Sequence, residues 1–386
     1  MRILYGVVGE GMGHATRSRV VIEHLLHAGH AVHVVGSRGA HGFLARTFAD
    51  REGFEITEIA GLHFVHEDGA IERLASFWSN LEQAPASLAR NLAAYVTVGE
   101  RFRPDLVVSD FESWAYLWGA AHGVPVVSID NIQVLHRCRH PPEIRGSDTF
   151  GFLLARYAAK WKMAGAYHYL VTSFFFPPVR KPRTTLVPPI LRPEILAARP
   201  EPGRHVVVYQ HADVLEHLLP ALSALSDQEF RVYGAGRKGR EGSVVLRPFS
   251  NEGFVEDLRT ARAVIAGGGF SLMSEAVHLH VPTLSVPLQK QAEQELNARW
   301  LAHLGYGGWV AALTPGAIAT FLESVDAHRE ALQRYVPHDN ETTFGCLDEI
   351  LRRAALGEPP PVSLDAPSLG DVVSTRIDTT LAEAGD

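Results

Sequence analysis

The sequence is poor in cysteine and holds no long apolar run. Cys138 and Cys346 are its two cysteines, and their wide separation in 386 residues excludes a disulfide framework or a metal-spaced pair. No apolar run reaches the ~20 residues that span a bilayer. The first strand pattern begins at once, with no signal peptide ahead of it. These absences predict a cytoplasmic protein in a reducing compartment.

The chain also lacks an excess of positive charge. Its 36 Lys and Arg against 43 Asp and Glu give a formal net charge of −7, which argues against a nucleic-acid partner. An Asp-x-Asp metal motif is absent, so no bound metal is expected. A hydrophobic content of 46% and a charged content of 20% are typical of a globular chain, and the length predicts two domains.

Two series of strand and helix patterns are present, separated by a proline-rich stretch. Strand patterns of the first series fall at 2–8, 31–36, 54–59, 105–109, 124–128 and 168–173, with helical patterns between several of them. Each series therefore predicts a mostly parallel sheet covered by helices. We predict these units: a first domain at 1–187, a hinge at 188–203, a second domain at 204–338, a helix capped by Asp339 at 339–356, and a flexible tail at 357–386.

The turn after the first strand carries three glycines and a histidine. Gly9, Gly11, Gly13 and His14 lie between a buried strand and an amphipathic helix, where a parallel sheet binds its ligands. The dinucleotide fingerprint G-x-G-x-x-G does not fit, because His14 stands where its third glycine belongs. A neutral imidazole at this place can accept a proton from a hydroxyl group. The alternative is a histidine that caps the helix or binds a backbone carbonyl.

Asp110 ends a second apolar strand, in the stretch Ser109-Asp-Phe-Glu112. If that strand lies near the first one, Asp110 reaches the same sheet edge as His14. A carboxylate there would fix the imidazole tautomer and stabilise the imidazolium that forms on proton abstraction. The alternative is that Asp110 caps the helix at 113–121, which is a common position for aspartate.

The second domain offers a candidate phosphate loop. Gly267, Gly268 and Gly269 follow a strand and open a helix, so backbone N–H groups and the helix dipole would face an anion there. Ser271 adds a hydroxyl, and Glu275 lies one turn further on, within reach of ribose hydroxyls. The alternative is a tight turn with serine caps.

Taken together, these stretches resemble the inverting glycosyltransferases of the GT-B fold. The chain is similar to the UDP-glycosyltransferase superfamily and the peptidoglycan N-acetylglucosaminyltransferase group, within a prokaryotic branch that opens GxGxGHxxR and carries SDFE. The resemblance covers residues 1–355. Its most specific part is 262–307, which runs from a glycine loop through a helical acid and a VPxLxVP strand to a Glu-Gln pair.

The resemblance implies an α/β fold of two Rossmann-like, doubly wound domains facing across a cleft, with a C-terminal helix that crosses back to the first domain. It also implies three sets of site residues. These are the catalytic base His14 with its orienting acid Asp110; the donor-binding Gly268, Gly269, Phe270, Ser271, Glu275, Glu293 and Gln294; and an acceptor or phosphate loop with Gly11, Gly13 and Arg17. Backbone groups of 247–250 are expected to contact the nucleotide base.

The implied reaction moves a hexose-type sugar from a UDP or TDP donor to an acceptor hydroxyl, with no cofactor beyond that nucleotide sugar. A sugar-nucleotide 2-epimerase, a non-catalytic sugar-nucleotide sensor and a nicotinamide-dependent oxidoreductase are the alternatives. The first would need no acceptor, the second would not turn over, and the third would bind nicotinamide.

The acceptor is expected to be a small molecule or a lipid-linked molecule, recognised by loops at 60–95 and 131–150. Residues 150–176 mix aromatic and apolar residues with cations, which is compatible with weak peripheral contact at the inner face of a membrane. A helix followed by a core strand is the favoured interpretation of this stretch. The sequence gives no oligomeric state.

Overall fold

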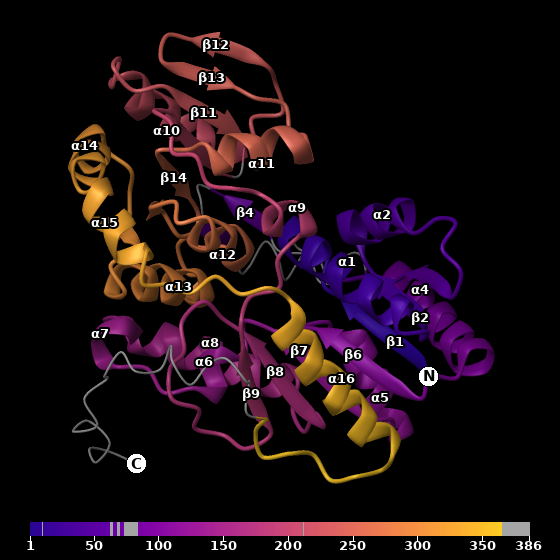
Figure 1. Ribbon diagram of the computed structural model, residues 1–386. Helices are drawn as coiled ribbons and strands as arrows, with labels where there is room; N and C mark the ends of the chain where they lie inside the picture. Colours follow the sequence, from indigo (N-terminus) through magenta and orange to yellow (C-terminus); the bar gives the residue numbers. More distant parts are fainter. Residues whose placement is uncertain (10, 62–64, 68–69, 73–83, 211, 365–386) are drawn as a thin grey trace.

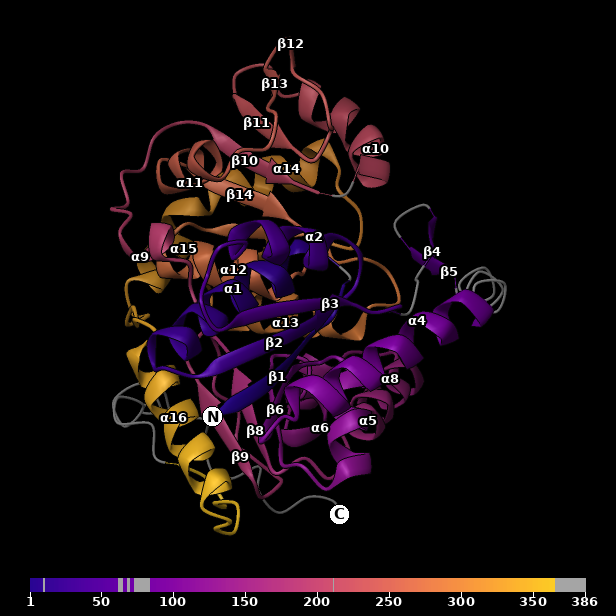
Figure 2. The same cartoon turned by 90° about the vertical axis from the view of Figure 1, so that its right-hand side faces the viewer.

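The computed structural model describes residues 1–9, 11–61, 65–67, 70–72, 84–210 and 212–364, and in this part of the chain the strands form two seven-stranded sheets and a two-stranded ribbon (Figure 1). Each large sheet has helices on both faces. The two sheets occupy separate units that meet along one boundary, and Figure 2 shows this boundary from a second direction. The predicted pair of doubly wound α/β units is therefore confirmed.

The first sheet has the order β3-β2-β1-β6-β7-β8-β9, and each strand pairs in parallel with its neighbours. Its inner strands are apolar and buried on both faces, as expected for a sheet covered by helices. The strands are β1 Arg2–Val7, β2 Ala31–Gly36, β3 Phe54–Glu58, β6 Leu106–Asp110, β7 Val126–Asp130, β8 His168–Thr172 and β9 Thr184–Val187, and β4 Val65–Glu67 pairs with β5 Ala70–Glu72 in the separate ribbon.

The helices of the first unit follow the strands along the chain. They are α1 Met12–His27, α2 Arg38–Thr47, α4 Ala84–Val96, the π-helical turn η1 Thr97–Phe102, α5 Ser113–His122, α6 Val134–Arg137, α7 Pro142–Arg145 and α8 Thr149–Lys162. A short helix, α9 Pro193–Leu196, lies in the linker to the second unit.

The second sheet has the order β12-β13-β11-β10-β14-β15-β16, with β12 as an antiparallel edge strand. Its strands are β10 Val206–Tyr209, β11 Phe230–Tyr233, β12 Gly239–Glu241, β13 Val244–Leu246, β14 Ala263–Ala266, β15 Thr283–Ser285 and β16 Gly307–Trp309. Its helices are α10 Ala212–Ser223, α11 Asn251–Arg259, α12 Phe270–His278, α13 Ala292–His303, α14 Pro315–Glu323 and α15 Val325–Leu332.

The strand order places a ligand-binding crevice in each unit. In the first sheet the chain leaves β1 toward β2 on one side and later returns to β6 on the other. In the second sheet β10 lies between β11 and β14 in the same way. Such switch points open a crevice at the carboxyl ends of the strands. The turn after β1 and the loop after β14 therefore lie at the two crevices.

The C-terminal helix α16, Glu341–Ala355, crosses back to the first unit, as predicted (Figure 1). Its N-cap residue is Asn340 and not the predicted Asp339, whose carboxylate accepts from the Glu341 N–H at 3.0 Å. The buried side chains Leu347, Ile350 and Leu351 of α16 belong to the same apolar cluster as residues of α1 and β1. The ring of Phe344 stacks on His24 of α1 at 4.1 Å between centroids. Burial of this face holds the end of the described chain against the first sheet.

The segment after α16 contacts β9. The backbone N–H of Thr184 donates to the Val362 carbonyl at 3.2 Å, and the Leu364 N–H donates to the Thr185 hydroxyl at 2.9 Å. The sequence predicts a flexible tail over 357–386, but residues 357–364 are bound here because an edge strand offers unpaired backbone groups. Residues 365–386 lie outside the described part of the chain.

Candidate active site

The structure brings His14 and Asp110 together at the carboxyl edge of the first sheet. β1 and β6 are neighbours in register, with Val7 beside Asp110, so the turn after β1 passes over the end of β6. His14 Nδ1 lies 2.8 Å from Asp110 Oδ1. The Asp110 side chain is fully buried, whereas that of His14 is 20% exposed. Because an ionised carboxylate only accepts hydrogen bonds, Nδ1 is the donor in this contact, and in the neutral imidazole Nε2 then keeps its lone pair. A guanidinium nitrogen of Arg17 also lies 3.0 Å from Nδ1.

A different acid caps the helix after β6. Glu112 is the N-cap residue of α5, and its carboxylate accepts from the backbone N–H of Trp114 at 2.8 Å and of Ala115 at 2.7 Å. The alternative role of Asp110 as a helix cap is therefore wrong. Both oxygens of Asp110 are left to side chains of α1.

Arg17 lies beneath the loop, against Asp110. Its Nε donates to Asp110 Oδ2 at 3.1 Å, a second guanidinium nitrogen donates to Oδ1, and the Ser18 hydroxyl donates to Oδ2 at 3.1 Å. The Arg17 side chain is 5% exposed. The sequence groups Arg17 with an acceptor or phosphate loop. The structure corrects this, because a guanidinium buried on a carboxylate is not presented to a ligand.

The charges around Asp110 keep it ionised. Burial by itself would raise the pKa of this carboxyl group, but the charges of Arg17 and His14 and their hydrogen bonds outweigh burial and lower its pKa to about 2. Asp110 therefore remains a fixed negative charge beside the imidazole at all physiological pH values. It can stabilise an imidazolium without taking the proton itself.

Gly11 and Gly13, in the turn after β1, are favoured at their positions for different structural reasons. Gly11 is the N-cap of α1 with φ of +75°, a conformation that favours glycine. At Gly13 a Cβ atom would lie 2.8 Å from the hydroxyl oxygen of Ser271 on α12. That hydroxyl donates to the Gly13 carbonyl at 3.2 Å. The turn that carries His14 thus touches the N-terminus of α12 in the other unit (Figures 1 and 2).

An apolar seam continues this boundary between the two units. Phe270 is buried and stacks on Phe174 with ring centroids 6.0 Å apart, and Trp300 stacks on Phe175 at 5.1 Å. The sequence includes Phe270 in the donor-binding loop. Because the Phe270 ring packs in this seam, only the backbone of Phe270 is left to contact a ligand.

Side chains of α13 hold the glycine loop 267–269, which follows β14, in place through hydrogen bonds. The Gly268 N–H donates to Gln294 Oε1 at 3.2 Å, and the Asn297 amide donates to the Gly268 carbonyl at 3.2 Å. Gln294 Oε1 also accepts from Leu288 N–H at 3.0 Å. Gln294 is expected from the sequence to hold the donor sugar, but its carbonyl oxygen supports the loop. α12 then begins at its N-cap Gly269 with no side-chain cap, so its first N–H groups are available to an anion.

The three-residue loop allows a matched test of this bracing. At Gly268 a Cβ would lie 2.3 Å from the Gln294 backbone oxygen, whereas at Gly269 it would have nothing within 4 Å. Gly268→Ala should therefore lower the free energy of unfolding by about 1–3 kcal/mol through overpacking, and Gly269→Ala should change it little. Urea unfolding of both variants checks this. Equal stability of the two would contradict the described loop.

Glu275 is bound by an arginine from the linker. Arg192 Nε and Nη2 donate to its two carboxylate oxygens, each at 2.7 Å, and both side chains are less than 10% exposed. Two residues further along the linker, Glu194 pairs with Arg19 of α1 at 2.9 Å. The linker thus holds an ion pair with each unit. The sequence predicts Glu275 as the ribose ligand, but Arg192 occupies part of its hydrogen-bonding capacity. Only the lone pairs that Arg192 does not use remain for a ligand.

The carboxyl group of Glu293 on α13 interacts electrostatically with His14 and Arg17 of the first unit. Burial raises the pKa of its carboxyl group, and the positive charges of His14 and Arg17 oppose that rise. The role of Glu293 at the donor sugar therefore stays a prediction from the sequence.

An aromatic pair at the carboxyl edge of the second sheet is not among the residues expected from the sequence. Phe249 is 62% exposed, and its ring centroid lies 6.4 Å from that of Tyr209 at the end of β10. The Phe249 ring also packs on Phe254 at 5.7 Å. The sequence signal for it is an aromatic residue in the loop that follows β13, three residues beyond Leu246. The resemblance implies only backbone contacts from 247–250.

The described residues contain no group of three or more His, Cys, Asp or Glu side chains arranged to hold a metal ion. Over the same residues, none of the helices has the length and apolarity needed to cross a membrane.

Two Rossmann-like sheets joined by a linker, with a C-terminal helix returning to the first unit, define the GT-B class of glycosyltransferases. Within that class, the chain belongs to glycosyl transferase family 1, whose model matches residues 1–326. The family assignment confirms the resemblance seen in the sequence and leaves the oxidoreductase alternative without support.

Relatives agree with this assignment over most of the chain. An "uncharacterized glycosyltransferase" of Methanosarcina acetivorans is 25% identical over 362 residues, covering 86% of this chain and 93% of the relative. The fold matches Phytolacca americana UGT2, solved with UDP-2-fluoro-glucose and pterostilbene, with a TM-score of 0.65 at 12% identity, covering 92% of this chain and 100% of that one. It also matches the glycosyltransferase VinC, solved with dTDP, with a TM-score of 0.59 at 17% identity, covering 92% and 100%.

Proposed function

We propose that the protein is an inverting, metal-independent glycosyltransferase that moves a hexose-type sugar from a UDP or TDP donor to an acceptor hydroxyl. One observation carries the proposal: the His14–Asp110 pair lies directly beside the N-terminus of α12, with Gly13 and Ser271 in contact. A base and a phosphate-binding helix end are what a displacement at an anomeric carbon requires on its two sides.

The acceptor side of the reaction belongs to the first unit. His14 Nε2 takes the proton of the acceptor hydroxyl as its oxygen attacks, which makes the oxygen a better nucleophile. Asp110 accepts from Nδ1 at 2.8 Å and stabilises the imidazolium. Arg17 and Ser18 hold that carboxylate in place. One displacement of this kind inverts the anomeric configuration.

The donor side belongs to the second unit. Negative charge develops on the β-phosphate as the nucleoside diphosphate leaves, and the free N–H groups and dipole of α12 stabilise it. Glu275 accepts from the ribose on the lone pairs that Arg192 leaves free, since a carboxylate has about four acceptor positions. The exposed ring of Phe249 offers a stacking surface for the base. The UDP derivative and the dTDP in the two solved relatives support this class of donor.

The sugar lies between the two sets of residues in this proposal. Glu293, whose carboxyl pKa is raised by burial and opposed by the charges of His14 and Arg17, is assigned to accept from hydroxyls of the sugar. Motion of the units for donor entry concentrates in the linker 188–202 and separates Ser271 from Gly13. The Phe174–Phe270 seam limits its range, because separating the units there would expose apolar surface.

A binding experiment tests the donor half of the proposal. Gly269→Ala fills the open space beside the α12 N–H groups without touching protein atoms, so it should weaken UDP and dTDP binding by about tenfold or more, the loss expected when a charge-assisted hydrogen bond is disrupted. Isothermal titration calorimetry measures both affinities. Gly316→Ala on α14 of the same unit, also with nothing within 4 Å, is the matched control.

Wild-type protein that binds neither nucleotide would overturn the donor assignment, and so would equal affinities in the wild type and Gly269→Ala. Product analysis then separates the enzymes that share this fold. Transfer consumes an acceptor, an epimerase converts the donor without one, and a sensor binds without turnover.

A further inference from the structure

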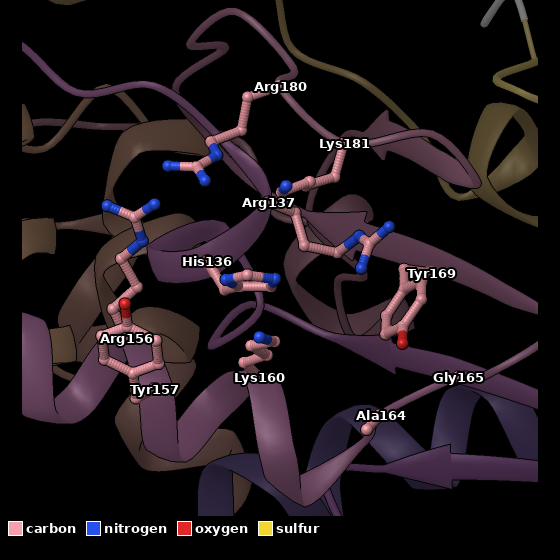
Figure 3. Close-up of a pocket in the computed structure, with 10 residues that line it drawn as sticks. All are labelled: His136, Arg137, Arg156, Tyr157, Lys160, Ala164, Gly165, Tyr169, Arg180 and Lys181. Carbon is pink, nitrogen blue, oxygen red and sulfur yellow. The ribbon is translucent and has the colours of Figure 1, made fainter. Parts of the chain in front are cut away.

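A cationic cavity lies in the first unit, formed by residues other than those placed at the cleft. Its volume is about 330 Å³, at the lower end of the range of roughly 300–1,000 Å³ found for ligand pockets. It is enclosed by α6, the second half of α8, the start of β8 and the segment before β9 (Figure 3). Its charged lining consists of His136, Arg137, Arg156, Lys160, Arg180 and Lys181.

The charge in this cavity is of one sign. No acidic side chain lines it, and within the described chain none of its five Arg and Lys side chains forms an ion pair. Figure 3 shows the side-chain ends of Arg156, Arg180, Lys160 and Lys181 directed toward a common space in front of the His136 ring. A concave surface lined by one sign of charge concentrates counter-ions, and this one therefore attracts anions.

The floor of the cavity is rigid. Arg137 Nε donates to the Thr184 hydroxyl at 2.6 Å, a second nitrogen donates to the Pro182 carbonyl, and the guanidinium carbon lies 3.5 Å from the centre of the Tyr169 ring. The surrounding charges act on His136. Its pKa is lowered to about 4, first by burial and then by the positive charges of Arg137, Arg156, Lys181 and Lys160. A fixed arginine with several freer cations around it suits a ligand with several anionic oxygens.

We propose that this cavity binds a phosphate monoester or diphosphate group. Guanidinium groups bind phosphate oxygens in pairs, and lysine ammonium groups add compact charges around the same anion. The net charge of −7 opposes a general attraction for polyanions, so binding depends on this local cluster. The proposal is independent of the reaction assigned to the cleft.

Two sources of phosphate fit this chemistry. One is a free phosphate compound in solution, and the other is a phosphate headgroup at a lipid surface. The helix α8 indicates the lipid source. It contributes Arg156 and Lys160 to the cavity. The same helix exposes the apolar side chains Phe150 (76%), Leu154 (45%) and Trp161 (68%). The helix followed by a core strand that is expected over 150–176 is present as α8 and the buried strand β8, and α8 in addition leaves an apolar face uncovered.

The test uses two double variants of the full chain. Arg156→Gln with Lys181→Gln removes two cavity cations that are only partly exposed and have no ion pairs. Arg51→Gln with Arg101→Gln makes the same change in net charge at exposed positions elsewhere. Inorganic pyrophosphate is titrated by calorimetry at fixed salt concentration, and flotation measures binding to phosphatidylcholine vesicles with and without phosphatidic acid. Pyrophosphate bound at the cleft contributes equally in all three proteins.

The proposal predicts roughly tenfold weaker binding for each cavity cation removed, with the control variant unchanged. Cavity-dependent binding of pyrophosphate alone identifies a free phosphate ligand. Cavity-dependent flotation that needs phosphatidic acid, and that Phe150→Ser with Trp161→Ser also lowers, identifies the lipid source. The proposal is overturned if neither probe binds, or if both double variants match the wild type. Should the first cavity variant fail to fold, Lys160→Gln with Arg180→Gln replaces it.

Discussion

Replacing His14 with alanine is expected to lower the rate of sugar transfer by about 10²–10⁴-fold, the range that a positioned general base contributes. The reason is geometric. His14 Nδ1 lies 2.8 Å from Asp110, so Nε2 is the nitrogen that remains for an acceptor, and the preceding residue Gly13 contacts Ser271 at the start of α12. The affinity for UDP or dTDP should stay nearly the same, because the proposed nucleotide contacts lie in the second unit.

The measurement is the initial rate of nucleoside diphosphate release with a donor and acceptor that the wild type turns over, together with calorimetric nucleotide binding. His27→Ala at the exposed end of the same helix is the matched control. Near-normal transfer by His14→Ala would mean that another group is the base. A large loss of nucleotide affinity with unchanged transfer at saturation would place the imidazole on the donor side.

Replacing Asp110 with asparagine is expected to destabilise the protein by about 3–5 kcal/mol, the cost of breaking a buried ion pair. Asp110 is fully buried and Arg17 is 5% exposed, so the substitution leaves a guanidinium without a counter-charge. Transfer should also fall, since an amide can present its NH₂ group to His14 and fix the wrong tautomer. Urea unfolding at neutral pH measures the stability, and steady-state kinetics measures the transfer rate.

The pH dependence gives a second signature of this pair. The pKa of Asp110 is lowered from 3.8 to about 2, so its ionised form stabilises the folded state above pH 3.8. That contribution is lost as the pH falls from 3.8 toward 2. The Asp110→Asn variant should therefore show a smaller loss of stability than the wild type across this interval.

A double substitution separates loss of the ion pair from general damage to the fold. Arg17→Met with Asp110→Asn removes both charges, so the double variant should be less destabilised than the sum of the two single variants. Additive effects would show that the two side chains do not interact as described. Unchanged stability of Asp110→Asn would contradict the buried pair altogether.

The arrangement of the two sheets could be predicted because parallel strands leave a strong pattern. Apolar runs such as 106–109 are buried on both faces and end in polar residues at one edge. Since neighbouring parallel strands end together, the sequence predicted that His14 and Asp110 meet if their strands are neighbours, and the pairing of β1 with β6 meets that condition. The glycines before α1 and α12 marked the two crevices for the same reason.

The partners of individual side chains could not be predicted, because they depend on contacts between distant segments. Glu275 is paired with an arginine 83 positions earlier, and Gln294 supports a loop 26 positions earlier. Arg17 packs under the turn after β1 because it pairs with Asp110, a buried carboxylate that only the fold brings close to it. The cationic side chains of the cavity come from three segments between 136 and 181, and only the fold brings these segments together.

The loops expected to recognise the acceptor lie at 60–95 and 131–150. Part of the segment expected to recognise the acceptor, at 62–64, 68–69 and 73–83, lies outside the described residues. The described part of it contributes α4, where Asn91 accepts from the Ala60 N–H at 2.8 Å. Side-chain chemistry on these loops carries no repeating pattern that sequence periodicity could detect.

The most direct test of the central claim is a crystal structure of the protein with UDP or dTDP bound. The account predicts that the diphosphate lies against the N–H groups at the start of α12, between Gly269 and Ser271, with the His14 imidazole facing it from the first unit. A nucleotide bound elsewhere, or a His14 ring turned away from the nucleotide into the first unit, would contradict the account.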